Sequence, residues 1–163
     1  HNLAGNVKKE ISIDHMAING LPEFLATISQ EYTKRVLPDY LPEGTKVAFR
    51  VWTVSQFAGD FNPIHIHDSN LSGVCFLKVP PKFDEEYSKE DHHPTAGCLE
   101  FIGSIPNHFA RHSFLVKPEV GDFYIFPSWL THQVYPFRSD GERRSMAFNV
   151  HFTMENPMKG VDV

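Results

Sequence analysis

Two histidines separated by a single residue, His65 and His67, are the first candidates for chemistry in this 163-residue chain. On an extended backbone alternate side chains project to the same face, so both rings would point to one spot. Imidazole nitrogens are common ligands of zinc, copper, iron and nickel. The spacing therefore predicts two nitrogen ligands for one metal ion. The structural alternative is a pair of histidines on a solvated strand face.

A third histidine, His132, follows a predicted strand and a tight corner. Its neighbours Trp129, Leu130 and Val134 are apolar, which predicts that the ring is at least partly buried. A buried imidazole needs a partner for each ring nitrogen, and a metal ion or a backbone carbonyl meets that need. His132 is thus a candidate third ligand, with a core histidine as the alternative. The remaining histidines lack a paired spacing and are expected at the surface or in structural roles: His15, His92, His93, His108, His112 and His151.

Two adjacent arginines, Arg143 and Arg144, are candidates for binding an anion, because a guanidinium grips a carboxylate through its planar fork. We expect them on a strand adjacent and antiparallel to the strand of His132. A tight turn and a longer loop both place Arg143 and Ser145 on the face of His132, and Arg144 on the opposite face. Pro136 cannot donate to a strand ladder, which favours the longer loop and brings Arg143 close to His132. Otherwise, either arginine would be an ordinary surface charge.

The elements that position these residues follow from the periodicity of the sequence. Apolar side chains recur every three or four residues over 21–37, which predicts a helix, and residues 11–18 are compatible with an edge strand or an extended arm. Beyond residue 46 the pattern becomes extended, with turn residues between short apolar runs. This predicts an all-β sandwich or barrel over 46–152 with the helix packed outside. Seven strands are expected: Lys46–Phe57, Ser72–Val79, Gly97–Ile102, Ser113–Val116, Asp122–Phe126, Thr131–Tyr135 and Arg143–Phe152.

The stretch Pro80–Thr95 has no periodicity and carries six charged residues between Asp84 and Asp91. It is expected to be an exposed loop. Its length and acidity raise the hypothesis of a lid over the barrel mouth, and the alternative is a solvated excursion. The two cysteines, Cys75 and Cys98, lie in separate apolar segments and are expected to be reduced core thiols rather than a disulfide or a zinc site.

Length and charge narrow the class of protein. A chain of 163 residues with 41% hydrophobic residues predicts one domain over 1–163. The net charge of -5 without a long basic block disfavours a nucleic-acid partner. No apolar run approaches the roughly 20 residues that span a bilayer, and residues at the start do not have the charged-then-apolar layout expected of a secretory signal. The expected protein is soluble, cytoplasmic and not membrane-bound.

At four places the chain resembles the Fe(II)- and 2-oxoglutarate-dependent oxygenases. The matching segments are His65–His67, Leu71–Leu77, Gly121–Ser128 leading to His132, and Arg143–Ser145, within residues 46 to 152. The resemblance implies a double-stranded β-helix, or jelly roll. It also implies Fe(II) as the metal and 2-oxoglutarate as the cosubstrate, with Arg143 and Ser145 binding the distal carboxylate of 2-oxoglutarate.

One position departs from the family pattern. Where the family has an aspartate or glutamate two residues after the first histidine, this chain has His67. Three arrangements follow: a triad of His65, His67 and His132, recruitment of Asp68 through a bulge, or two protein ligands completed by water. We favour the three-histidine triad because Asp68 points away from His65 on a regular strand. A triad of neutral imidazoles would also admit zinc or copper more readily than one with a carboxylate.

The resemblance implies a dioxygenase that hydroxylates a small-molecule or peptide substrate and releases succinate and CO2. Two alternatives remain. One is a cupin-like metalloenzyme that has three histidines and does not use 2-oxoglutarate, and the other is a non-catalytic jelly-roll binding module. The sequence has no motif that selects the prime substrate.

Overall fold

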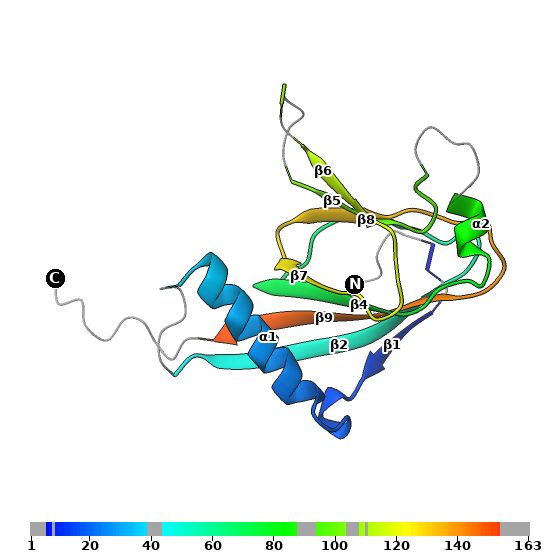
Figure 1. The fold of residues 1–163 in the computed structure, drawn as a ribbon. Helices are drawn as coiled ribbons and strands as arrows, with labels where there is room; N and C mark the ends of the chain where they lie inside the picture. Colours follow the sequence, from blue (N-terminus) through cyan, green and yellow to red (C-terminus); the bar gives the residue numbers. More distant parts are fainter. Residues whose placement is uncertain are drawn as a thin grey trace.

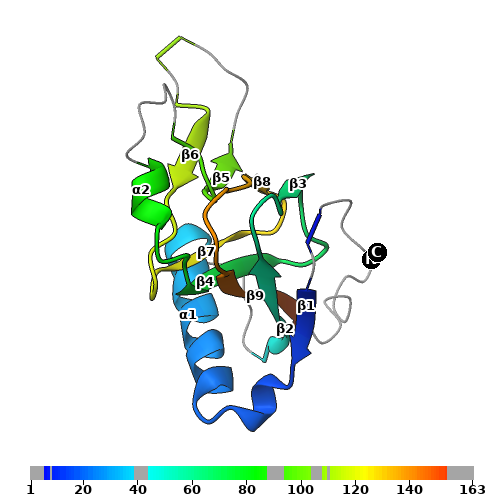
Figure 2. The same cartoon turned by 90° about the vertical axis from the view of Figure 1, so that its right-hand side faces the viewer.

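The computed structural model describes residues 6–7, 9–38, 44–87, 94–103, 108–109 and 111–153. Two antiparallel sheets face each other (Figures 1 and 2). The larger sheet has the order β1 (Lys9–Ile13), β2 (Lys46–Gln56), β9 (Arg143–Thr153), β4 (Leu71–Lys78) and β7 (Phe123–Pro127). The smaller sheet has the order β3 (Asn62–His65), β8 (Thr131–Val134), β5 (Leu99–Ile102) and β6 (Ser113–Val116).

From β2 to β9 the chain passes from one sheet to the other at every connection except the hairpin between β5 and β6. Four strands of each sheet take part in this winding, and β1 extends the larger sheet at its edge. This alternation produces the double-stranded β-helix, which confirms the predicted all-β fold. Side chains that alternate along each strand point either between the sheets or away from them.

Helix α1 (Leu21–Val36) covers the outer face of the five-stranded sheet (Figure 1). The short 3-10 helix η1 (His15–Ala17) precedes it, and the predicted helix 21–37 is confirmed. Leu25 is fully buried and belongs to one apolar cluster with Val51, Phe148 and Val150. The cluster joins α1 to the outer face of the five-stranded sheet, and the opposite face of the sheet lines the barrel interior.

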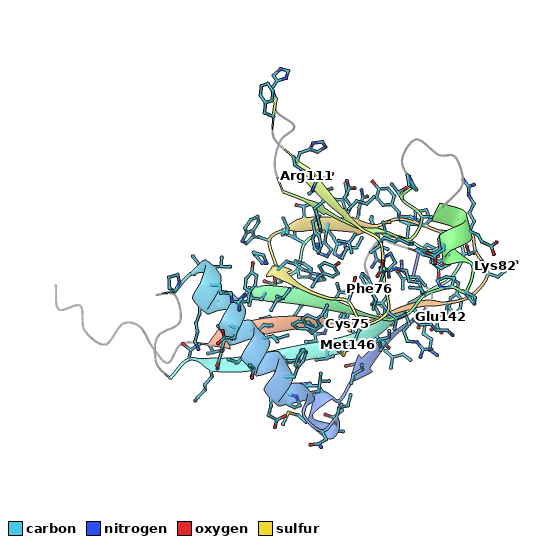
Figure 3. The ribbon with its side chains drawn as sticks, viewed as in Figure 1. Cys75, Phe76, Lys82, Arg111, Glu142 and Met146 are labelled. Atoms are coloured by element: carbon cyan, nitrogen blue, oxygen red, sulfur yellow. The ribbon has the colours of Figure 1, made fainter. Side chains whose placement is uncertain are left out.

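A second apolar cluster fills part of the space between the sheets. Its buried members are Phe76, Leu99, Phe101, Val116, Phe126 and Val134. Phe76 lies between the sheets, whereas Met146 packs against the outer cluster beneath α1 (Figure 3). The strand alternation thus divides the residues of one sheet between two cores.

One local prediction, the exposed loop Pro80–Thr95, needs correction. Part of the expected exposed loop Pro80–Thr95 is helix α2 (Phe83–Tyr87), and Phe83 is only 3% exposed. Glu86 anchors α2 by accepting hydrogen bonds from the backbone N–H groups of Arg138 and Ser139, at 2.7 and 2.9 Å. The loop prediction was wrong here because residues distant in sequence supply the partners of α2. Residues 88–93, with His92 and His93, lie outside the described part of the chain.

The described structure has two strands, β1 and β3, in addition to the seven predicted ones. β1 confirms the edge strand predicted for the start of residues 11–18, but His15–Ala17 of that range form η1 instead. β3 contains the first histidine of the candidate site. Cys75 and Cys98 form no disulfide in the described part of the chain; Cys98 is fully buried, whereas Cys75 is only partly buried.

Candidate metal centre and anion pocket

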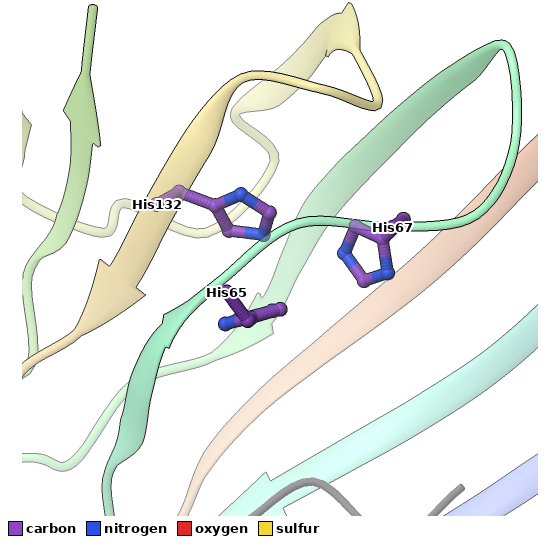
Figure 4. Close-up of side chains that lie close together, drawn as sticks. All are labelled: His65, His67 and His132. Carbon is purple, nitrogen blue, oxygen red and sulfur yellow. The ribbon is translucent and has the colours of Figure 1, made fainter.

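The three candidate histidines meet inside the barrel (Figure 4). His65 on β3 is the register partner of His132 on β8, and their ring centroids are 4.2 Å apart. His67 follows β3, with its ring centroid 5.1 Å from that of His65 and 5.0 Å from that of His132. One nitrogen of each ring lies within 4.8 Å of the other two. The three rings therefore provide a nitrogen set for one metal ion.

Backbone carbonyls orient two of the rings. His65 Nδ1 lies 2.7 Å from the carbonyl oxygen of Pro63, and His132 Nδ1 lies 2.8 Å from that of Leu130. A carbonyl only accepts hydrogen bonds, so in each neutral ring the proton is on Nδ1. Nε2 is then the lone-pair nitrogen available to a metal, and the ring orientation is fixed as in many metal sites.

A serine cluster holds the loop that carries His67. The backbone N–H of His67 donates to the Ser128 carbonyl at 3.0 Å. The Ser128 hydroxyl bonds to Ser69 at 2.5 Å and to Ser72 at 2.8 Å, and Ser72 donates to Asn149 at 2.9 Å. This chain of bonds connects the loop to β4 and β9, so the third ring is positioned by the larger sheet.

Burial keeps the three imidazoles neutral. Desolvation, and then the charges of His132 and His65, lower the pKa of His67 to about 3. Desolvation, followed by the charge of His65, lowers the pKa of His132 to about 4, against the opposing bond to Leu130. Desolvation also lowers the pKa of His65. Neutral imidazole is the form that binds a metal, so this donor set fits a divalent ion at neutral pH.

The carboxylate alternative for the triad does not fit the geometry. Asp68 is exposed and is not part of the histidine group. His65 and His67 are partly buried, whereas Ile64, Ile66 and Asp68 are exposed, so the extended alternation persists beyond the end of β3. Asp68 therefore points away from the cluster.

A small cavity of about 60 Å³ connects the histidines to a second group of polar residues. Arg143 and Ser145 on β9 line it, together with Gln56 on β2 and Glu10 on β1. Its wall also includes apolar side chains and one further amide: Trp52, Val54, Asn62, Val74, Leu99, Phe126, Val134 and Ala147.

Arg143 is buried in this wall, with 2% of its surface exposed. Its Nε donates to the Gly97 carbonyl at 3.0 Å and its Nη1 donates to Gln56 Oε1 at 2.6 Å. The guanidinium carbon lies 5.0 Å from the centre of the Phe76 ring. Burial lowers the pKa of Arg143 to about 10, so the group is still cationic at pH 7.

The neighbouring arginine has a different environment. Arg144 donates to both carboxylate oxygens of Glu142, each at 2.9 Å, and its side chain is 45% exposed. Among the described residues no carboxylate forms an ion pair with Arg143. A buried cation without an anionic partner is costly. The Arg143 end of the cavity is therefore suited to an anionic ligand.

The sequence predicted that His132 and Arg143 lie on adjacent strands, and this pairing was wrong. The prediction that both side chains face the barrel interior agrees with the structure. β8 pairs with β3 and β5, and β9 pairs with β2 and β4, so His132 and Arg143 are not on adjacent strands. The segment that follows β8 crosses from the smaller sheet to the larger one instead of closing a hairpin. Arg143 and His132 line the same cavity because their sheets face each other across the barrel.

Sequence reasoning missed three polar residues of the cavity: Gln56, Glu10 and Asn62. Gln56 and Glu10 carry no motif, and their contribution depends on the pairing of β1 with β2 and of β2 with β9. The only sequence feature that points to Gln56 is its spacing: on a strand, residues 52, 54 and 56 share one face, so Gln56 lies on the same face as Trp52 and Val54.

The double-stranded β-helix encloses three histidines that could hold a metal ion, and comparison with known proteins identifies the family. Residues 50–149, more than half of the chain, match the family described as "Putative 2OG-Fe(II) oxygenase". The chain belongs to this family, whose cofactor is Fe(II) and whose cosubstrate is 2-oxoglutarate. No curated protein sequence matches it significantly.

Solved structures share the fold at low sequence identity. A Pseudomonas putida prolyl-4-hydroxylase is 20% identical with a TM-score of 0.57, over 87% of this chain and 70% of that one. A 2OG-Fe(II) oxygenase family oxidoreductase from Burkholderia pseudomallei is 14% identical with a TM-score of 0.51, over 88% and 66%. A Trichoplax adhaerens prolyl hydroxylase, solved with a hypoxia inducible factor peptide fragment, is 15% identical with a TM-score of 0.51, over 86% and 60%. The chain thus spans 60 to 70% of the length of these three structures.

Among the described residues, no helix has both the length and the apolar character needed to cross a membrane.

Proposed function

We propose that this protein is an Fe(II)- and 2-oxoglutarate-dependent dioxygenase that hydroxylates a small-molecule or peptide substrate. The observation that carries the proposal is Arg143, a buried cation without an ion-pair partner among the described residues. It lines the same cavity as the three histidines. A ligand that is both a metal chelator and an anion at its far end matches these two features.

In this proposal His65, His67 and His132 hold Fe(II) through ring nitrogens, and the carbonyls of Pro63 and Leu130 orient two of the rings. Arg143 and Ser145 hold the distal carboxylate of 2-oxoglutarate. When bound, the metal and O2 supply the oxidising power: 2-oxoglutarate loses CO2 and becomes succinate, taking one oxygen atom, while the other oxygen enters a substrate C–H bond.

The chain's own contribution is positioning and exclusion of water. Gly97 and Gln56 fix two N–H groups of Arg143, so its remaining donors have a defined direction. Ser145 is 4% exposed and lies next to Arg143 on the inward face of β9. The apolar wall around them lowers the local dielectric, which strengthens the attraction of Arg143 for a carboxylate.

The test is an anaerobic titration of the Fe(II)-loaded protein with 2-oxoglutarate, followed by the visible metal-to-ligand charge-transfer band. We expect a saturable band for the wild type. Arg143→Met should raise the dissociation constant at least about 30-fold, because it removes a buried charged partner. The matched variant Arg144→Met, on the opposite face of the same strand, should leave it unchanged. Bound metal without a band would contradict the proposal.

The second candidate is a three-histidine metalloenzyme that does not use 2-oxoglutarate. His67, at the position where the family has a carboxylate, is the observation that favours it. Metal retained by both the wild type and Arg143→Met, with no 2-oxoglutarate bound by either, would support this candidate. A non-catalytic module would instead fail to retain stoichiometric metal, and its metal content would not respond to His65→Ala or His132→Ala.

A further inference from the structure

Gln56 is the residue of β2 directly opposite Arg143 in the register with β9. It is 0% exposed and lines the cavity shared by Arg143, Ser145 and the three histidines. A fully buried polar side chain at this place needs partners for its carbonyl oxygen and for its amide nitrogen.

The orientation of this amide is determined by chemistry. Gln56 Oε1 lies 2.6 Å from Arg143 Nη1. A guanidinium has only donors, so the amide end facing it must be the acceptor oxygen. The amide nitrogen is therefore directed elsewhere, and exchanging the two ends would place two donors against each other.

No described residue provides a hydrogen-bond acceptor for the amide nitrogen of Gln56. In the described part of the chain three buried side-chain polar atoms are without a partner: Gln56 Nε2, Asp60 Oδ1 and Asn62 Oδ1. Gln56 Nε2 is the donor among them. The cavity wall also includes apolar side chains, such as Val54, Leu99 and Val134, which offer no acceptor. A buried N–H group left without an acceptor is destabilising, so an acceptor supplied by a ligand would complete it.

We propose that Gln56 donates a hydrogen bond from Nε2 to the distal carboxylate of the cosubstrate. Gln56, Arg143 and Ser145 then form one anion site, which selects a 2-oxo acid with a second carboxylate over one without it. A carboxylate has lone pairs on two oxygens, so it accepts from the amide and the guanidinium together. This inference rests on the proposed function and adds a specificity residue to it.

The test compares Gln56→Glu with Gln56→Met. Gln56→Glu is isosteric and keeps an acceptor for Arg143, but it replaces the unpartnered donor with an anionic oxygen. Gln56→Met removes both the donor and the acceptor and adds no charge. Thermal unfolding of the metal-loaded variants checks that each one folds.

Affinity is measured by anaerobic calorimetry on the Fe(II)-loaded proteins, with 2-oxoglutarate and with 2-oxobutyrate, which has no distal carboxylate. Gln56→Glu should weaken 2-oxoglutarate binding by about 100-fold or more, because a charged hydrogen bond is replaced by repulsion. Gln56→Met should weaken it by about 10-fold. Binding of 2-oxobutyrate should change less than about threefold in both variants, since the lost interaction is with the absent carboxylate.

A control places the same amide-to-acid change elsewhere in the cavity. Asn62→Asp, on the facing sheet, should weaken 2-oxoglutarate binding less than Gln56→Glu. Equal losses in the two variants would mean that added charge alone is responsible, and this would contradict a directed hydrogen bond from Gln56.

Two other outcomes separate this inference from the proposed function. Wild-type affinity in Gln56→Glu, with reduced affinity in Gln56→Met, would show that Gln56 only positions Arg143, and the inference would be wrong while the function stands. A metal-loaded wild type that binds no 2-oxoglutarate would overturn both.

Discussion

The two sheets of the barrel contribute different chemistry to one cavity. The larger sheet supplies Arg143, Ser145 and Gln56 from strands of 11 residues, whose outer face is covered by α1. The smaller sheet, built from four-residue strands, supplies His65 and His132. The anion-binding residues therefore lie on long strands covered by α1, whereas two of the three metal ligands lie on short strands.

The strand pairing also differs between the two sheets. β2 and β9 form an unbroken ladder of 11 register pairs, from Lys46 with Thr153 to Gln56 with Arg143. β3 and β8 have two register pairs with an irregularity between them, and one of these pairs is His65 with His132. Metal binding would link these short strands through their side chains, so we expect the smaller sheet to depend on the metal more than the larger one does.

The largest expected effect is the loss of a ligand from the smaller sheet. His132→Ala removes the most buried of the three rings, and we expect metal affinity to fall at least 100-fold, more than the roughly 10- to 100-fold typical of outer-shell changes. Metal analysis after dialysis measures this loss. His112→Ala, an exposed histidine just before β6, is the matched control and should retain metal. Full metal occupancy in His132→Ala would remove the basis for the metal centre.

The contrast in packing is tested by the same substitution in each sheet. Phe148 on β9 is fully buried and stacks on Phe123, with ring centroids 5.4 Å apart. Phe148→Ala should lower the free energy of unfolding by about 3–5 kcal/mol. Phe114 on β6 is 50% exposed, so Phe114→Ala should cost about 1 kcal/mol. Urea unfolding of the metal-free protein measures both, and similar costs would contradict the difference between the sheets.

The sequence predicted those parts of the fold that depend on local periodicity. Helix α1 and the strands of the larger sheet follow from the spacing of apolar residues and the turn residues between them. The pairing of the arginine strand could not be obtained in this way. Side chains alternate along β9 whether it follows β8 in a hairpin or crosses to the other sheet. The inward face of Arg143 was therefore predicted correctly, although the neighbouring strand was not.

The candidate site shows the same division. His65 and His67 share a face because of their spacing, which the sequence displays directly. The loop of His67 is held by Ser128, 61 residues further along the chain, and no local pattern indicates that contact. Helix α2 was missed for a similar reason, since Glu86 finds its partners at Arg138 and Ser139 only after the chain has folded.

A smaller effect is expected from pH, and between pH 7 and pH 5 its main source should be the buried histidines of the smaller sheet and its loop. In the unfolded chain the pKa of histidine is about 6.5, whereas burial lowers the pKa of His67 to about 3 and that of His132 to about 4 in the folded protein. Below pH 6.5 the unfolded state of the metal-free protein therefore binds more protons than the folded state. Stability should fall as the pH decreases through 6.5 towards 4, and above about pH 7.5 these two groups contribute almost no pH dependence.

The measurement is urea unfolding of the metal-free protein at pH 7 and pH 5, compared with His67→Gln and His132→Gln. Each variant should show a smaller loss between the two pH values than the wild type, because one depressed pKa is removed. The Arg143→Met variant should show the wild-type loss, since Arg143 does not titrate in this range. An unchanged slope in both histidine variants would mean that the rings are more solvated than their burial indicates.

The smallest expected effect concerns the one carboxylate that the larger sheet contributes to the cavity. Glu10 on the edge strand β1 lines the cavity, and its charge opposes the lowering of the pKa of His65. The same negative charge attracts a divalent ion, but Glu10 is exposed and the attraction is screened. Glu10→Gln should therefore weaken metal binding by about two- to fivefold at low salt, and by less at high salt.

Glu23→Gln, the same change on the exposed surface of α1, is the control and should have no effect. The outcome decides how the two sheets share the metal. A loss of more than about 100-fold in Glu10→Gln would be too large for a screened charge and typical of a lost ligand. Glu10 would then supply, from the larger sheet, the carboxylate that is absent at position 67, and the separation of metal ligands from anion-binding residues would be wrong.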